Sequence, residues 1–584
     1  MSTESLDNTS SDDASGASST KVVQDDLSTL RKVPAPIPLS VYLLGFAELI
    51  ERLTVRYHDE LRVPDDDLKS DSFQLFGPSV IFINFIQQPL PASITGAGFA
   101  DGQSGALGLG QRASTGLTTF FVLWCYVTPL IGGYVADAHF GRMKTMSIAI
   151  VIRLIGHIIL IVSSLPGVIQ HSDAATGVFV VALVVMGLGT GMFSSNISPL
   201  LGEQCLAATP APVVKVTSKG ERVLVDPALT ISRVFLYFYL IINVAALIGQ
   251  ISLTYCEKFL GFWVAYTLSA GVFLVCPLIL FLGRNKIVSS PPSGAVLATV
   301  LKFWWRSSKG KWHLNPLATY KDFRSANFWE EQKLKYAQDE KSQASTTVIS
   351  EQWFDDVKTA IKACKVLCWF PVYWLTYNQL NNNLTSQAAT MTTKGFPNDV
   401  INNLAPLALV ILIPICDLWF YPALRRVGIQ FGPLKKLFAG FMIGSAAMVY
   451  AAVVQAYVYK TNPCGTHASD CHDASGQVAV SPISVWVQSG CYILIAISEI
   501  FAAITGLEHA FTKAPKSMRS FVTAIFLFMS AVSGALSEIF VSLSSDPLLV
   551  WNYGVMAVLA AVTGVAFWIS VHKMDRRDSA PGGA

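Results

Sequence analysis

Twelve apolar segments of about 20 residues recur along this chain, and this pattern constrains the fold more than any other feature. Hydrophobic residues make up 52% of the 584 residues, charged residues make up 14%, and the mean hydropathy is +0.46. These values lie outside the range of a soluble protein of this length. We therefore predict an all-α integral membrane protein with twelve transmembrane helices. The expected spans are 37–53, 114–136, 145–166, 177–201, 230–253, 259–283, 363–384, 399–423, 434–457, 483–506, 518–543 and 547–572.

The 42 Lys and Arg residues predict how the chain is oriented. If the N-terminus is cytoplasmic, most of them fall in cytoplasmic segments, as the positive-inside rule requires. Both termini are therefore expected in the cytoplasm. The net charge of +3 is explained by this topology and gives no reason to expect binding to nucleic acid. The basic residues expected outside are Arg112, Lys258, Lys394 and Lys460.

Composition also divides the chain into segments. Residues 1–36 are rich in Ser, Asp and Thr and lack the apolar core of a signal peptide, so we expect a disordered cytoplasmic tail. Residues 284–361 are strongly charged and predict a cytoplasmic linker, partly amphipathic, between two groups of six helices. The N-terminal six-helix bundle is expected at 37–283 and the C-terminal one at 362–572, followed by a cytoplasmic tail at 573–584.

Two of the ten cysteines share a polar loop that is expected outside the membrane. Cys464 and Cys471 predict a disulfide there, because that side is oxidising. A zinc site that adds His467 and His472 is the alternative interpretation. The other eight cysteines lie in or beside the apolar segments, where small packing residues are usual.

The first apolar segment carries three ionisable residues on one helical face. Glu48, Glu51 and Arg52 are spaced i, i+3 and i+4. Charged groups inside a bilayer are costly unless they pair and line a wet cavity. This cluster therefore predicts the working part of a transporter.

A short acidic and basic pattern occurs in both halves of the chain. Asp137 is followed by Arg142 after the second span, and Asp417 is followed by Arg425 and Arg426 after the eighth. Such a recurrence is typical of parallel half-repeats in a transporter. Two ordinary positively charged cytoplasmic loops would give the same pattern, so the spacing alone leaves both interpretations open.

Seven motifs in order resemble one family over residues 37–572. The sequence is similar to the proton-coupled oligopeptide transporters, the peptide transporter family of the major facilitator superfamily, and most of all to the fungal branch. The resemblance implies the major facilitator superfamily fold and the import of di- and tripeptides by alternating access, driven by protons across the plasma membrane. The motifs are ExxER at 48–52, CYVTP around Tyr126, GGYVADxxxGR at 132–142, GLGTGMFSSNISPL at 187–200, FYLIINVAAL at 238–247, PVYWLTYNQ with QAATM at 371–391, and SEIFAAITGLEHAFTKAP at 498–515.

A zwitterionic peptide requires a cation for its carboxylate, an anion for its ammonium group and amide partners for its backbone. Arg52 is the expected carboxylate ligand because a guanidinium presents two donors, although permanent pairing with Glu48 and Glu51 is the alternative. Glu499 is the expected partner of the ammonium group. The other expected substrate-binding residues are Asn378, Gln379 and Asn403, which offer donors and acceptors, and Tyr126 and Trp374, which line the pocket by family position.

Protons are the expected coupling ion, and no other cofactor or metal is predicted. Glu48 and Glu51 are the candidate proton acceptors, because burial favours a neutral carboxyl and a nearby Arg52 favours the charged form. Substrate binding to Arg52 would then allow Glu51 to take a proton. By the same resemblance, Asp137 and Arg142 are expected to form a cytoplasmic gating latch. The intramembrane residues Arg153 and Arg233 receive no predicted role.

Two features depart from the family pattern. Ser194 stands where family members usually carry a Lys that is thought to pair with the acids of the first helix, so proton coupling or the substrate could differ. Residues 55–74 interrupt the first helix with a charged segment that cannot lie in the bilayer core. Removing them restores the family spacing, and their terminal codons are compatible with intron boundaries. A retained intron or gene-model error is our interpretation, and a genuine segment that loops out of the bundle is the alternative.

The sequence also leaves the cargo open. Nitrate or another small anion could be carried on the same fold, although Glu499 argues against an anionic cargo. A sensor or a paralogue that no longer transports is the third possibility, favoured by Ser194 and the 55–74 segment. An enzyme is not expected, because no phosphate-binding loop, zinc spacing or nucleophile elbow occurs.

Overall fold

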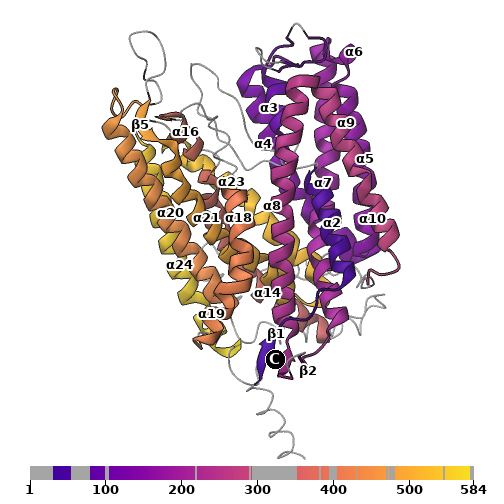
Figure 1. The fold of residues 1–584 in the computed structure, drawn as a ribbon. Helices are drawn as coiled ribbons and strands as arrows, with labels where there is room; N and C mark the ends of the chain where they lie inside the picture. Colours follow the sequence, from indigo (N-terminus) through magenta and orange to yellow (C-terminus); the bar gives the residue numbers. More distant parts are fainter. Residues whose placement is uncertain are drawn as a thin grey trace, which may run out of the picture.

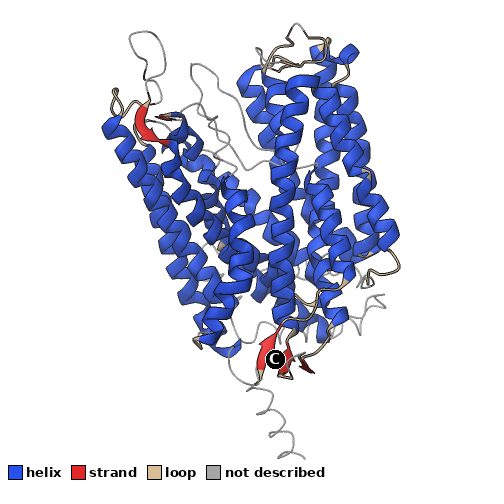
Figure 2. Ribbon diagram, in the orientation of Figure 1, coloured by secondary structure: helices blue, strands red, loops and turns tan. Residues whose placement is uncertain are grey.

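The computed structural model describes an almost entirely helical protein (Figure 2). Helices of the N-terminal half stand on one side of the molecule and most helices of the C-terminal half stand on the other (Figure 1). The described residues are 30–53, 79–288 and 351–578, without 92, 99–103, 218–219, 381–382, 393–403, 429–430, 469–470, 472–479 and 544–545, together with the single positions 291 and 305.

The N-terminal half contains α2 Leu39–Leu53, α3 Ser79–Gln87, α4 Gly110–Val135, η1 Ala136–Phe140, α5 Arg142–Ser163, α6 Pro166–Ile169, α7 Ser172–Ala208, α8 Pro227–Leu260, α9 Phe262–Phe273 and α10 Val275–Gly283. The C-terminal half contains α14 Glu351–Leu367, α15 Phe370–Tyr377, η2 Asn378–Leu380, α16 Asn383–Ala389, α18 Leu404–Ile415, η3 Cys416–Phe420, α19 Tyr421–Arg426, α20 Pro433–Thr461, η4 Val485–Gln488, α21 Ser489–Glu499, η5 Ile500–Ile504, α22 Thr505–Thr512, η6 Lys516–Met518, α23 Arg519–Ser537, η7 Glu538–Leu543 and α24 Leu549–Asp578. The two halves meet where α8 packs against α18 and where α4 and α7 pack against α23.

Ten helices among the described residues are long and apolar enough to cross a membrane. They correspond to ten of the twelve expected spans. The first expected span is represented by α2, which has 15 residues and is followed by residues outside the described part of the chain. The seventh is divided into α14, α15 and α16. Pro371 in the first turn of α15 helps to explain this division, because proline cannot donate the hydrogen bond that continues a helix.

Close packing of α5 on α7 positions the buried residues of the N-terminal half. Gly189 on α7 faces Arg153 on α5, and a Cβ atom at Gly189 would lie 2.8 Å from the Cβ atom of Arg153. A larger residue at this position would push the two helices apart. Small residues serve this purpose widely in helix pairs within membranes.

Three strands form a small sheet in the order β1-β3-β2 at the lower end of Figure 1. We call this the sheet end. Strand β1 Arg31–Val33 runs parallel to β3 Arg222–Val225, and β2 Val213–Val216 runs antiparallel to β3. The expected disordered tail of residues 1–36 is therefore wrong for its last part. The cause is the β2–β3 hairpin, whose free edge supplies backbone hydrogen bonds that a tail in water lacks.

The opposite end carries a second short pairing, in which β4 Met391–Thr392 lies parallel to β5 Ser481–Ser484. The nearby loop contains the Cys464–Cys471 disulfide, with 5.6 Å between the Cα atoms. Within the described part of the chain, no group of His, Cys, Asp and Glu side chains could hold a metal ion. His472, the 55–74 segment and most of the 284–361 linker lie outside the described residues. The last helix, α24, continues to Asp578, past the expected boundary at residue 572.

Candidate functional site

The carboxylate of Glu51 forms a buried ion pair with Arg153. Glu51 lies near the end of α2 and Arg153 lies in the middle of α5, and neither side chain is exposed to solvent. Arg153 Nη1 donates to Glu51 Oε1, and Nη2 donates to the Glu51 backbone oxygen over 3.3 Å. The guanidinium carbon also lies 4.6 Å from the ring centre of Phe273 on α9. A charge pair and an aromatic face together compensate for the burial of this guanidinium.

The pair supplies a cation to the first-helix acids even though position 194 carries none. Glu48 is fully buried one turn before Glu51, and Cys276 on α10 lies within electrostatic range of both. Ser194 is half-buried on α7. Arg52 belongs to α2, but its side chain lies outside the described residues. The predicted role of Arg52 as a carboxylate ligand therefore stays a prediction.

Glu499 connects the two halves of the chain. It is the last residue of α21 and is 1% exposed. Tyr239 on α8 donates its hydroxyl to Glu499 Oε1, and Tyr377 on α15 donates to Oε2 over 2.8 Å. The carboxylate thus accepts one phenol from each half, in a position where burial strengthens its attraction for a cation.

Aromatic rings pack next to Tyr377, one of the two tyrosines that donate to this carboxylate. Trp374 is half-buried on α15, with its ring centre 5.5 Å from Tyr377 and 6.2 Å from Phe526 on α23. Tyr126 is half-buried on α4. The structure therefore brings Trp374 next to Tyr377, which donates to Glu499, and its role as a pocket wall stays a prediction.

The expected amide ligands are in part engaged within their own segment. Asn378 and Gln379 begin the short helix η2 and are both buried. Gln379 donates to the Leu375 carbonyl over 3.2 Å, and its own amide oxygen accepts from Asn383. Asn403 lies outside the described residues.

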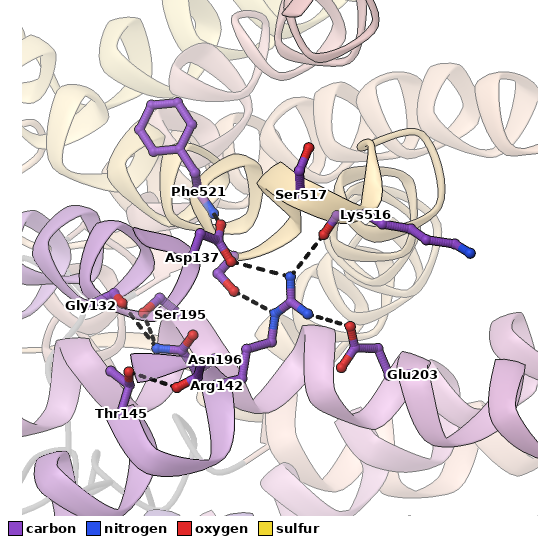
Figure 3. Close-up of polar contacts among 12 residues, drawn as sticks. Gly132, Asp137, Arg142, Thr145, Ser195, Asn196, Glu203, Lys516, Ser517 and Phe521 are labelled. Carbon is purple, nitrogen blue, oxygen red and sulfur yellow. Dashed lines mark hydrogen bonds and ion pairs between the residues drawn. The ribbon is translucent and has the colours of Figure 1, made fainter. Parts of the chain in front are cut away.

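Asp137 and Arg142 come together at the sheet end and contact the other half of the chain (Figure 3). Asp137 is the second residue of the π-helix η1, and its Oδ2 accepts a bond of 3.1 Å from the backbone N–H of Phe521. Phe521 lies in the first turn of α23, where free N–H groups and the helix dipole favour a negative charge. Arg142 donates to Asp137 over 3.2 Å and pairs with Glu203 on α7.

The same arginine extends this contact into the C-terminal half. Arg142 Nε donates to Ser520 Oγ over 2.7 Å. Its Nη2 donates to the Lys516 carbonyl over 3.2 Å (Figure 3). Arg142 is 4% exposed. These bonds join the α4–α5 turn to the start of α23.

The acidic and basic pattern that recurs in the C-terminal half also contacts the opposite half of the chain. Asp417 is the second residue of the π-helix η3, as Asp137 is of η1. Arg233 Nε on α8 donates to Asp417 Oδ2 over 2.8 Å. Ser232 beside it donates to Glu508 on α22 over 3.0 Å. Each half therefore presents an aspartate from a π-helical turn to the other half.

Sequence reasoning missed several partners in these clusters. Arg153 and Arg233 were visible as charges inside apolar segments, but the helices that meet them are distant in sequence. Glu203 on α7 gave the same signal, a carboxylate within a long apolar helix. Tyr377 gave none, because a tyrosine among aromatic residues resembles ordinary packing.

The chain is similar to a set of fungal peptide transporters along most of its length. It is 37% identical to "Probable peptide transporter ptr2" of Schizosaccharomyces pombe, covering 94% of this chain and 81% of that protein. It is 37% identical to "Peptide transporter PTR_C" of Candidozyma auris, covering 95% and 88%, and 34% identical to "Peptide transporter PTR2" of Saccharomyces cerevisiae, covering 94% and 82%.

The fold is also that of solved POT family transporters. An auto-inhibited POT family peptide transporter superposes with a TM-score of 0.56 at 17% identity, covering 92% of this chain and 97% of that one. The POT family transporter PepTSo gives a TM-score of 0.57 at 18% identity, covering 93% and 99%. Together with the ten apolar helices, these matches make the chain a multi-pass membrane protein.

The family model described as "POT family" matches residues 143–558, which is more than half of the chain. This agreement confirms the resemblance that the motifs predicted. The match begins after Glu48 and Glu51, so the family model does not cover these two acids. The chain belongs to the POT family.

Proposed function

We propose that this protein imports di- and tripeptides together with protons across the plasma membrane, by alternating access between its two halves. The proposal includes twelve transmembrane helices in two six-helix bundles. Both termini lie in the cytoplasm in this proposal. The names of the fungal relatives support peptides as the cargo, and nitrate has no such support.

The observation that carries the proposal is the buried Glu499 carboxylate with a tyrosine from each half. An ammonium group that approached this carboxylate would exchange phenol hydrogen bonds for a charge pair. Because Tyr239 and Tyr377 come from different halves, that exchange would change the contact between the halves. Binding of the cargo and movement of the halves would then be linked.

Glu51, with Glu48 one turn away, is the proposed proton site. A buried carboxylate whose counter-ion is one arginine is stable when charged and can become neutral by taking a proton. Asp137 and Arg142 form the proposed gate at the sheet end, which the orientation rule assigns to the cytoplasm. Opening of this end toward the cytoplasm would require their bonds to Phe521 and Ser520 to break.

Reconstitution into liposomes tests this proposal. With an acidic exterior, labelled dialanine should accumulate, and nitrate should not. Glu51→Gln should abolish accumulation and leave exchange of dialanine across the membrane intact, whereas the exposed control Asp173→Asn should behave as the wild type. A variant that lacks residues 55–74 should transport at least as well as the full chain. Dialanine uptake that ignores both pH and Glu51→Gln would disprove proton coupling.

A further inference from the structure

His157 on α5 is a fully buried residue whose imidazole makes no hydrogen bond to the described residues. It is 0% exposed, and neither ring nitrogen has a hydrogen-bond partner among the described residues. Leaving a buried polar group without a hydrogen bond lowers the stability of the folded state. Most buried side-chain polar atoms in native proteins are hydrogen-bonded, so this exception requires an explanation, such as a chemical role or a bound water.

His157 lies one helical turn beyond Arg153 on α5. Side chains at i and i+4 on a helix are neighbours, so a long guanidinium can reach a ring at this spacing. Both residues contact the same aromatic ring: the centre of the His157 ring is 5.3 Å from that of Phe273, and the Arg153 guanidinium carbon is 4.6 Å from it. The Phe273 ring therefore contacts both groups.

The titratable groups around the two residues differ. Glu51, Cys276 and Cys125 lie within electrostatic range of Arg153, contributed by α2, α10 and α4. For His157, the charged neighbour among the described residues is Arg153 itself. On the other sides, α9 contributes Phe273 and α7 packs against the adjacent Gly156 through Met186. The imidazole is thus an acceptor without competing charges.

We propose that Arg153 has two binding positions, one on the Glu51 carboxylate and one on the acceptor nitrogen of His157. In the first, the charged Glu51 holds the guanidinium. When Glu51 takes a proton from the exterior, its attraction for Arg153 falls, and the guanidinium turns to the neutral imidazole while both groups stay in contact with Phe273. Arg153 stays charged and His157 stays neutral, so one proton enters with each cycle. Arg153 and His157 are positioning residues in this scheme.

This inference rests on the proposed function, and its first test is transport by variants that differ only at the acceptor. His157→Leu removes the acceptor nitrogen, whereas His157→Gln retains an acceptor oxygen. Loss of the second position should reduce proton-driven accumulation of dialanine about tenfold, the equivalent of one hydrogen bond to a charged group, with exchange of dialanine unchanged. His157→Gln should restore accumulation. The matched control is the exposed His171→Leu, which should equal the wild type.

Two results would overturn the inference. One is equal accumulation in His157→Leu and the wild type. The other is an equal loss of accumulation and exchange in His157→Leu, which would indicate a structural role only.

A second measurement separates this inference from the proposed function, because it needs no peptide. Infrared difference spectra of the purified protein, recorded between neutral and acidic pH, should show a change in guanidinium bands that disappears in Arg153→Gln and is altered in His157→Leu. Identical spectra in the wild type and His157→Leu would refute the two positions. If the spectral changes are present but the wild type does not transport dialanine, the proposed cargo is refuted and the two positions of Arg153 are not.

Discussion

Arg233 on α8 and Asp417 on η3 form a 2.8 Å ion pair that joins the N-terminal half to the C-terminal half. The pair is the counterpart of the contact between Asp137 and the start of α23. Both aspartates are second residues of π-helical turns, which frequently occur at functional positions. The sheet end is therefore closed by two reciprocal contacts.

Breaking the Arg233–Asp417 pair should loosen this closure. We expect Arg233→Ala and Asp417→Ala each to increase maleimide labelling of the neighbouring Cys416, a buried thiol, a few-fold. The side chain of Arg233 is 31% exposed, so the coupling energy from a double-mutant cycle should be only about 1 kcal/mol. Peptide mass spectrometry measures the labelling.

The exchanged pair, Arg233→Asp with Asp417→Arg, should return labelling toward the wild-type level. Arg222→Ala changes an exposed arginine on β3 and serves as the control. Labelling that is the same in all variants would show that this pair does not hold the halves together.

Loss of the Glu499 charge should act on the amino group of the cargo. For Glu499→Gln, we expect the KM for dialanine to rise by roughly ten- to a hundredfold, as for loss of a hydrogen bond between charged groups. N-acetyl dialanine has no ammonium group, so its weak inhibition of uptake should not change. Competition assays in liposomes measure both values. An equal effect on the two compounds would argue that Glu499 has another role.

The buried Glu257 should make the free energy of unfolding depend on pH. It lies near the end of α8, outside the apolar span, and Asn84 donates to it over 2.7 Å. Burial raises the pKa of Glu257 from 4.5 to about 8, more than its hydrogen bonds lower it. The folded state therefore holds a proton that the unfolded state has lost between these values, so stability falls as pH rises from about 4.5 to 8, by up to roughly 1.4 kcal/mol per unit.

Thermal unfolding followed by intrinsic fluorescence between pH 5 and pH 9 should reveal this slope. Glu257→Gln keeps a neutral side chain and should flatten the slope, whereas the exposed Glu221→Gln should leave it as in the wild type. If Glu257→Gln and the wild type have parallel profiles, another group is responsible.

The Cys464–Cys471 disulfide closes a loop with a sequence separation of 7. Replacing both cysteines by Ser should lower the free energy of unfolding by about 2 kcal/mol, because a short closed loop restricts the unfolded chain modestly. The reducing agent dithiothreitol should lower the Tm of the wild type toward that of the variant. Cys368→Ser alters an exposed free cysteine and should change neither value.

Much of this architecture follows from hydropathy, because each apolar segment must satisfy its backbone hydrogen bonds internally. Two local features of the fold could not be predicted from hydropathy. The break before α15 depends on how Pro371 is accommodated. Strand β1 depends on a hairpin far along the chain, as the sequence separation of 190 between Arg31 and Glu221 shows. Pattern reasoning has no access to such long-range pairing.

The candidate site also has residues that the sequence predicts and partners that it does not predict. Glu51, Glu499 and Asp137 were identifiable because an acid in an apolar segment is costly and demands a reason. Their partners were not, since the cation for Glu51 comes from α5, and a phenol for Glu499 comes from the opposite half. A single sequence shows which charged residues fall in apolar segments. Which of them contact one another depends on the fold.

Strand β1 has a practical consequence for labelling the protein. The backbone of β1 is paired with β3, which belongs to the connection between α7 and α8. A fluorophore or fusion partner attached just before Arg31 would therefore move together with that connection. Energy transfer from such a donor to an acceptor near α19 would then record the approach and separation of the halves in real time.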